Sequence, residues 1–326
     1  LTQVTTAQQE RITNINIENA PAPLFRDPVY DGAADPVVLW NPLEKEWVML
    51  YTQRRANLEA PYLAWAHGTR IGIATSKDGV SWLYRGTPEG LDFERGHNTY
   101  WMAEALFDKG LFHFWIVYKK GFSSTWAGDP RMMHYTSDNL WDWKFEGPAN
   151  LNYMNVVENN IYKMPGGTWR TWYKTYRPEG GWGIYVSESN DLYKWVQRKG
   201  KAFEGYNNEG ARVFYWNNNY WLITDEWRGI GVYRSKEGDK WARQPGLLLS
   251  MPGRRTDDNN YGGNPYTVVQ DNRAFIIYHS HPGWLHNKVD FWEEADSYDE
   301  RRSVIQIAEI EIKDGWLFIN RDKYLK

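Results

Sequence analysis

A repeated hairpin pattern organises most of this 326-residue chain. In each copy a polar or acidic residue precedes an apolar run, a short turn and a second, aromatic-rich run. Two such runs joined by a turn of Asp, Asn, Gly or Pro predict a β-hairpin. The lead residues of the five copies, between 51 and 69 residues apart, are Asp35, Glu104, Glu158, Glu209 and Asn264.

A second hairpin pattern follows each of the first four copies and links a serine to a tryptophan. The serines at 76, 137, 187 and 235 precede tryptophans by six, six, eight and six residues. The fifth copy, residues 305–316, departs from the pattern, as terminal repeats usually do. Two hairpins per unit make a four-stranded blade. The sequence therefore predicts an all-β, five-bladed β-propeller, one domain over residues 1–326, with residues 1–24 as an N-terminal strap or closing segment.

Composition narrows the classes of function. The net charge of −3 gives no electrostatic reason to bind nucleic acid or an anionic membrane. The absence of cysteine excludes disulfides, thiolate metal sites and a cysteine nucleophile. No cofactor and no metal site are predicted. Because the chain begins at Leu1 rather than Met, we expect a removed leader and a secreted or periplasmic protein.

Aromatic residues are unusually frequent, at 17% of the chain with 20 Trp and 22 Tyr. Aromatic side chains favour strands and bury large areas, so most of them are expected in the blade cores. Their flat apolar faces also suit the C–H faces of sugar rings. The composition therefore favours an oligosaccharide as the partner.

The lead residues predict an active site. The first strand of every blade lines the central channel of a propeller, so equivalent positions converge on its axis. Four of the five lead residues are carboxylic acids, and burying several acids together pushes their pKa values apart. Glycoside hydrolysis needs such a division between an ionised base and a protonated acid. The alternative is that these acids make ordinary turn or cap hydrogen bonds at strand starts.

Further polar residues lie where strands end, near the expected mouth of the channel, or in the long connections of the first two blades. A histidine pair is not a specific zinc motif, so these residues are interpreted as contacts to substrate. The candidate substrate-binding residues are Glu104, Trp101, His67, Arg54, Lys174, Asp225, Asn264, His279 and His281.

These motifs resemble family 43 glycoside hydrolases and their relatives in families 117 and 32. The resemblance covers roughly residues 30–320 and is carried by Asp35-Pro36, residues 101–104, Glu209-Gly210 and the outer Ser/Trp hairpins. Residues 67–74 and 301–306 are similar to a bacterial branch of glycosidases. The resemblance implies an exo-acting hydrolase of plant or algal oligosaccharides that inverts the anomeric centre.

The resemblance also implies three catalytic roles. Asp35 matches the general base, Glu158 the residue that tunes the pKa of the acid, and Glu209 the general acid. The chain departs from the family pattern in having Glu158 for Asp, Ala211 for Pro, and Asn264 where His is common. Two other functions stay open: phosphorolysis, with phosphate held by Arg54, Arg55 and Lys174, and a sugar-binding propeller without catalysis.

Overall fold

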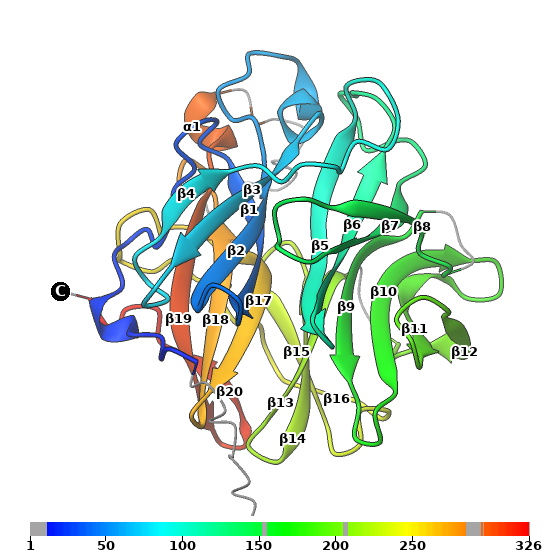
Figure 1. Ribbon diagram of the computed structural model, residues 1–326. Coiled ribbons are helices and arrows are strands. Elements are labelled where there is room, and N and C mark those ends of the chain that lie inside the picture. Colours follow the sequence, from blue (N-terminus) through cyan, green and yellow to red (C-terminus); the bar gives the residue numbers. More distant parts are fainter. Residues whose placement is uncertain (1–11, 152–154, 205–207, 285–294, 296, 326) are drawn as a thin grey trace, which may run out of the picture.

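The computed structural model is a five-bladed β-propeller, which confirms the predicted fold (Figure 1). The structure describes residues 12–151, 155–204, 208–284, 295 and 297–325. Each blade is one antiparallel four-stranded sheet built from a continuous stretch of chain. The division into a single domain with a strap at residues 1–24 stays a prediction, and residues 1–11 lie outside the described residues.

The blades follow one another in chain order, and the strands of each run from the channel outward. Blade 1 contains β1 (Ala33–Asn41), β2 (Glu46–Gln53), β3 (Arg70–Ser76) and β4 (Leu83–Gly86). Blade 2 contains β5 (Thr99–Asp108), β6 (Leu111–Lys119), β7 (Arg131–Ser137) and β8 (Lys144–Pro148). Blade 3 contains β9 (Val157–Lys163), β10 (Trp169–Arg177), β11 (Gly181–Ser189) and β12 (Val196–Lys201). Blade 4 contains β13 (Glu209–Trp216), β14 (Asn219–Asp225), β15 (Ile230–Ser235) and β16 (Ala242–Arg243). Blade 5 contains β17 (Gly263–Gln270), β18 (Arg273–Ser280), β19 (Val304–Lys313) and β20 (Trp316–Ile319).

Contacts between the innermost strands close the ring. β1 touches β5, β5 touches β9, β9 touches β13, β13 touches β17, and β17 returns to β1. An apolar core fills each interface between neighbouring blades, because both faces of every blade are covered. Most of the abundant aromatics lie in these cores, including the fully buried Trp115, Trp172 and Trp221.

The chain entering blade 1 packs across the closing interface. Ile15, Ile17 and Leu24 are buried in the core between blades 5 and 1, and Phe25 forms a β-bridge to Ile305 of β19. Three short helices accompany the sheets: η1 (Ile17–Asn19), η2 (Tyr62–Ala66) and α1 (Tyr298–Arg301). Among the described residues, no helix is long and apolar enough to cross a membrane.

The outer hairpins share one serine turn, and here the sequence interpretation was wrong in blade 3. The serine that ends β11 is Ser189, not Ser187. Its hydroxyl accepts the backbone N–H of Leu192 at 2.9 Å, as Ser76, Ser137 and Ser235 each accept the N–H three residues ahead. With Ser189, the serine stands six residues before the tryptophan in all four blades.

A β-bulge near the start of each innermost strand sets which residues face one another across the channel. The hydrogen-bond register shifts at Asp35, Ala103, Glu158, Gly210 and Asn264. Four of these residues have positive φ angles of 51°, 47°, 59° and 34°, with Ala103 the exception. The prediction that Glu104 and Glu209 are equivalent to Asp35 is therefore wrong: Glu209 precedes its bulge, and Glu104 follows its own. The hydrogen-bond register decides which residue of each blade is equivalent to Asp35. The pattern of side chains in the sequence does not reveal an inserted bulge residue.

Candidate active site

Asp35 is a buried, ionised carboxylate at the bulge of β1. Arg54, which follows β2, donates to its two oxygens at 3.0 and 3.3 Å, and both side chains are only 7% exposed. Burial pushes the pKa of Asp35 up, but the Arg54 charge and hydrogen bonds from Asn264 and Thr52 outweigh it. The pKa of Asp35 therefore lies below its usual range.

Asn264 joins Asp35 to Glu158. Its side-chain amide nitrogen donates to Asp35 Oδ1 and to Glu158 Oε1, both at 2.9 Å. These two bonds use both hydrogens of the amide. Asn264 occupies the bulge of blade 5, so a neutral residue from one blade links acids from two others. The assignment of Asn264 as a substrate-binding residue stays a prediction, and its amide nitrogen already donates to the two carboxyl groups.

Glu158 has the opposite proton preference from Asp35. Burial raises its pKa well above the usual value, and the nearby charges of Glu209, Asp35 and Asp225 raise it further. Its Oε2 is buried without a hydrogen-bond partner in the structure. The amide of Asn264 thus joins a carboxyl group whose pKa is lowered to one whose pKa is raised.

Glu209 and Asp225 are cross-strand partners at the mouth of blade 4. Burial raises the pKa of Asp225 to about 7, although the backbone N–H of Asn264 donates to its Oδ2 at 2.7 Å. The side chain of Glu209 is 22% exposed. Lys174 of β10 donates to Glu209 Oε2 at 3.1 Å, and the indole N–H of Trp227 donates to Oε1 at 2.7 Å.

A histidine and a short helix hold Arg54 in place. Arg54 Nη1 lies 3.2 Å from His281 Nε2, and the other ring nitrogen of His281 lies 3.3 Å from the carbonyl of Glu300 in α1. Burial lowers the pKa of His281 well below its usual value, so its ring is neutral and its Nε2 accepts from Arg54. His279 is also buried and neutral, with a pKa lowered to about 3 by burial and by Arg54. Its Nδ1 accepts the backbone N–H of Asp35 at 3.3 Å.

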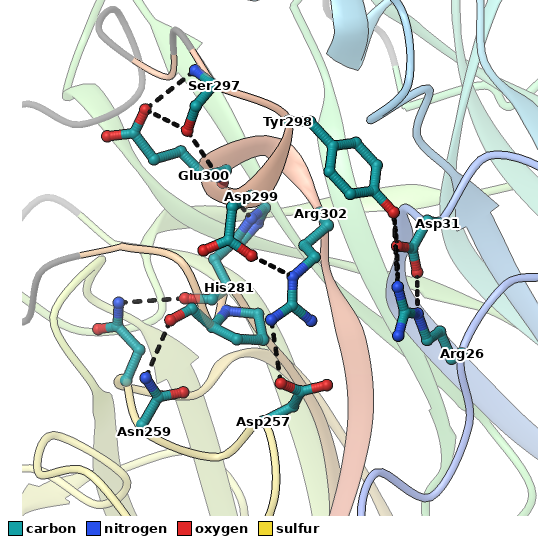
Figure 2. A network of polar contacts seen from close by, with 12 residues as sticks. Arg26, Asp31, Asp257, Asn259, His281, Ser297, Tyr298, Asp299, Glu300 and Arg302 are labelled. Atoms are coloured by element: carbon teal, nitrogen blue, oxygen red, sulfur yellow. Dashed lines mark hydrogen bonds and ion pairs between the residues drawn. The ribbon is translucent and has the colours of Figure 1, made fainter.

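The α1 turn is fixed by its own polar network (Figure 2). Ser297 caps the helix by accepting the N–H of Glu300, whose carboxylate accepts in return from the Ser297 backbone and hydroxyl. Tyr298 and Arg26 both donate to Asp31 on the segment before blade 1. Figure 2 shows His281 directly beneath this turn, so α1 is tied to Asp35 through His281 and Arg54.

Three predicted substrate-binding residues have structural partners instead. Glu104 is 1% exposed, and its oxygens accept from Asn160, from the Ile161 and Ala105 backbone, and lie 3.6 Å from Arg212. His67 is fully buried, with one ring nitrogen on the Leu63 carbonyl and the other on Lys119. The indole of Trp101 donates to the Ala66 carbonyl. The sequence gives no sign of these partners, because they come from segments that the fold brings together.

The structure thus brings Asp35, Glu158, Glu209, Asp225 and Asn264 into one electrostatically coupled group. Arg54, Lys174 and His279 contact that group directly. Trp227 was missed as a site residue, although the run Asp225-Glu226-Trp227 at a strand end was the available signal. No cluster of three or more potential metal ligands occurs among the described residues.

Several solved glycoside hydrolases have the same fold. A thermostable family-43 glycoside hydrolase gives a TM-score of 0.64 at 18% identity, over 91% of this chain and 96% of that one. A GH32 beta-fructofuranosidase of Bombyx mori gives 0.66 at 14% identity, over 94% of this chain and 66% of that one. A GH43 beta-xylosidase/alpha-arabinofuranosidase from a compost microbial metagenome, in complex with xylotriose, gives 0.65 at 12% identity, over 91% and 96%.

These likenesses confirm, at the level of the fold, the resemblance to families 43 and 32. The chain spans about two thirds of the length of the Bombyx mori enzyme and nearly all of the two family-43 enzymes. No protein-family model and no curated protein matches the sequence.

Proposed function

We propose that the protein is a glycoside hydrolase whose reaction is carried out by three neighbouring carboxyl groups, those of Asp35, Glu158 and Glu209. One observation carries the proposal: Asn264 bridges Asp35 and Glu158, two buried carboxyl groups whose pKa values are shifted in opposite directions. Hydrolysis of a glycosidic bond requires a base and an acid on one substrate, and a fold places such a pair by giving two carboxyl groups different environments. The fold shared with glycoside hydrolases supports the proposal.

In this proposal Asp35 is the base that takes a proton from the attacking water. Arg54 keeps Asp35 ionised between turnovers, and His279 holds its backbone. Glu209 is the acid at the leaving oxygen, because its side chain is 22% exposed and can reach a substrate. Glu158 lies beside them with a pKa that burial raises well above its usual value, so it takes up a proton more readily than Asp35 does. The water adds to the anomeric carbon as hydroxide, and the leaving sugar departs with the proton.

We propose oligosaccharides as substrates, with inversion of the anomeric centre. Aromatic residues at the mouth and the xylotriose bound by the compost-metagenome enzyme support a carbohydrate substrate. Phosphorolysis is not favoured, because Arg54 and Lys174 already pair with Asp35 and Glu209. Arg55 donates to the carbonyls of His67 and Ala64.

Carboxamide variants test the proposal. Wild-type protein is incubated with a panel of plant and algal oligosaccharides, and product is followed by chromatography. We expect Asp35→Asn and Glu209→Gln each to lower turnover by roughly 10²–10⁴-fold, the usual contribution of acid or base catalysis. Glu237→Gln, an exposed carboxyl group on β15's outer turn, is the matched control and should retain full turnover.

The same experiment separates the alternatives. Unchanged turnover in Asp35→Asn or Glu209→Gln would reject the role given to that residue. Tight binding of an oligosaccharide with no cleavage of any panel member would reject hydrolysis and favour a sugar-binding propeller. Product that forms only when phosphate is added would favour phosphorolysis.

A further inference from the structure

Two exposed tryptophans flank Lys174 beside Glu209. Lys174 Nζ lies 5.0 Å from the ring centre of Trp227 and 5.8 Å from that of Trp182. Lys174 itself is buried, whereas Trp182 is 52% exposed and Trp227 36% exposed. The ammonium therefore covers part of each indole and leaves the remaining ring surface open to solvent. We call Lys174, Trp182 and Trp227 the aromatic slot.

The backbone fixes both rings of the slot. Trp182 pairs across β10 and β11 with Tyr176, whose ring packs edge-on at 5.9 Å. Trp227 follows β14 with a φ of 59°, a left-handed conformation that is uncommon for a large side chain. Its N–H donates at 2.6 Å to Asp225 Oδ1, which holds this turn, and its indole reaches Glu209. Non-glycine residues held in this conformation concentrate at functional sites.

The two sides of the carboxyl group differ in accessibility. On the side of blades 1 and 5, Asp35, Arg54 and His279 are all less than a tenth exposed and are bonded to one another. On the side of blades 3 and 4, Glu209 opens toward the exposed rings of the slot. The side of blades 3 and 4 is therefore the side on which exposed rings can contact a sugar unit beside Glu209.

We propose that the aromatic slot binds the sugar unit on the leaving side of the scissile bond, which makes the substrates oligosaccharides rather than glycosides of small alcohols. This inference rests on the proposed function, because it takes Glu209 as the acid next to the leaving oxygen. The C–H face of a sugar ring packs on an indole face, and the Lys174 ammonium donates to a ring hydroxyl. A small alcohol as leaving group would leave most of the exposed ring area uncovered.

The kinetic test compares two leaving groups on the same glycosyl unit. Xylobiose, arabinobiose and sucrose are tested beside xylosyl, arabinosyl and fructosyl fluoride, because fluoride is too small to fill the slot. For the pair that wild-type protein cleaves, we expect Trp182→Ala to lower kcat/KM at least about tenfold on the disaccharide and less than about threefold on the fluoride. Trp182→Phe should recover most of the loss, because the phenyl ring retains a flat face.

Phe318→Ala is the matched control. Phe318 is an exposed ring, 38% accessible, on the outermost strand of blade 5, and it carries a lysine, Lys313, 5.3 Å from its centre. It should change neither rate. If Trp182→Ala lowered kcat/KM equally on the disaccharide and the fluoride, or did not lower it on the disaccharide, the proposed role of the aromatic slot would be refuted.

A binding experiment keeps the slot testable without turnover. Wild-type protein is run in native gels containing soluble arabinoxylan, arabinan or levan, where binding retards migration. We expect retardation in at least one gel, its loss in Trp182→Ala, and its retention in Phe318→Ala. Retardation that depends on Trp182, without hydrolysis of any substrate, would support the slot and refute the hydrolase. Retardation that persists in Trp182→Ala would refute the slot alone, and neither binding nor hydrolysis by the wild type would refute both.

Discussion

Arg54→Met tests whether the ion pair with Asp35 is the electrostatic support of the site. The substitution keeps a long apolar stem and removes the only cation that contacts Asp35 among the described residues, together with the bond to His281. Both partners of the pair are 7% exposed, so the carboxylate left behind cannot regain water. Removing one partner of a buried pair costs about 3–5 kcal/mol, and we expect a loss of this size in the free energy of unfolding at pH 7.

The loss should depend on pH in a stated direction. In the wild type the pKa of Asp35 is lowered, so its stabilisation is present above the unfolded value of about 4 and disappears as pH falls through the folded value. In the variant we expect burial to outweigh the remaining hydrogen bonds from Asn264 and Thr52 and to raise the pKa of Asp35, so stability falls as pH rises past about 4. The difference between wild type and variant should therefore be larger at pH 7 than at pH 4.

Urea unfolding followed by tryptophan fluorescence at both pH values measures the effect. Arg70→Met is the control, because its pair with Asp92 is 41% and 49% exposed and should contribute less than about 1 kcal/mol. The double variant Asp35→Leu/Arg54→Met should be more stable than Arg54→Met alone, since no unpaired charge is left. A cost below about 1 kcal/mol that is equal at pH 4 and pH 7 would refute this account of the site.

Three further predictions follow from the bulges, the outer turns and Asp225. Gly210→Ala should destabilise by about 1–3 kcal/mol in urea unfolding, because a Cβ there lies 2.6 Å from Asn264 Oδ1 at a φ of 59°; a loss under 0.5 kcal/mol would contradict the bulge geometry. Ser189→Ala should cost about 1 kcal/mol by losing the turn bond to Leu192, whereas Ser187→Ala should not reproduce that loss through the turn; hydrogen exchange at the Leu192 amide separates the two. Because the pKa of Asp225 is raised to about 7, this residue makes the wild type lose stability as pH rises from about 4 to 7. Asp225→Asn should flatten this dependence of stability on pH in thermal unfolding, and an unchanged dependence would show that Asp225 is not its source.

The fold was predictable because the repeat consists of apolar runs and turn residues, which can be recognised in the sequence directly. Alternating apolar runs and short turns locate the strands, and their number and spacing give five four-stranded blades. Asp35 and Glu158 were predicted to meet because the first strand of every blade lines the channel. Trp and Tyr in the blade cores followed from the same pattern.

The fine geometry was not predictable, because it depends on hydrogen-bond register and on burial. Because of the bulge in β13, Gly210 rather than Glu209 occupies the position equivalent to Asp35, and no pattern of side chains in the sequence indicates that shift. Ser187 and Ser189 are equally good turn residues until the end of β11 is known. The raised pKa values of Glu158 and Asp225 arise first from burial and then from neighbours that include residues of other blades, far away in the chain.

The bulges carry a consequence for how such a protein acquires its chemistry. Each one inserts a residue into the innermost strand of a single blade, and the strand beyond it keeps its regular pairing. Acid, amide and glycine occupy these positions in one molecule, as Asp35, Asn264 and Gly210. The same architecture can therefore present different chemical groups around one axis, provided that neighbouring blades still bond the backbone of the bulge, as His279 does at Asp35 and Asp225 does at Asn264.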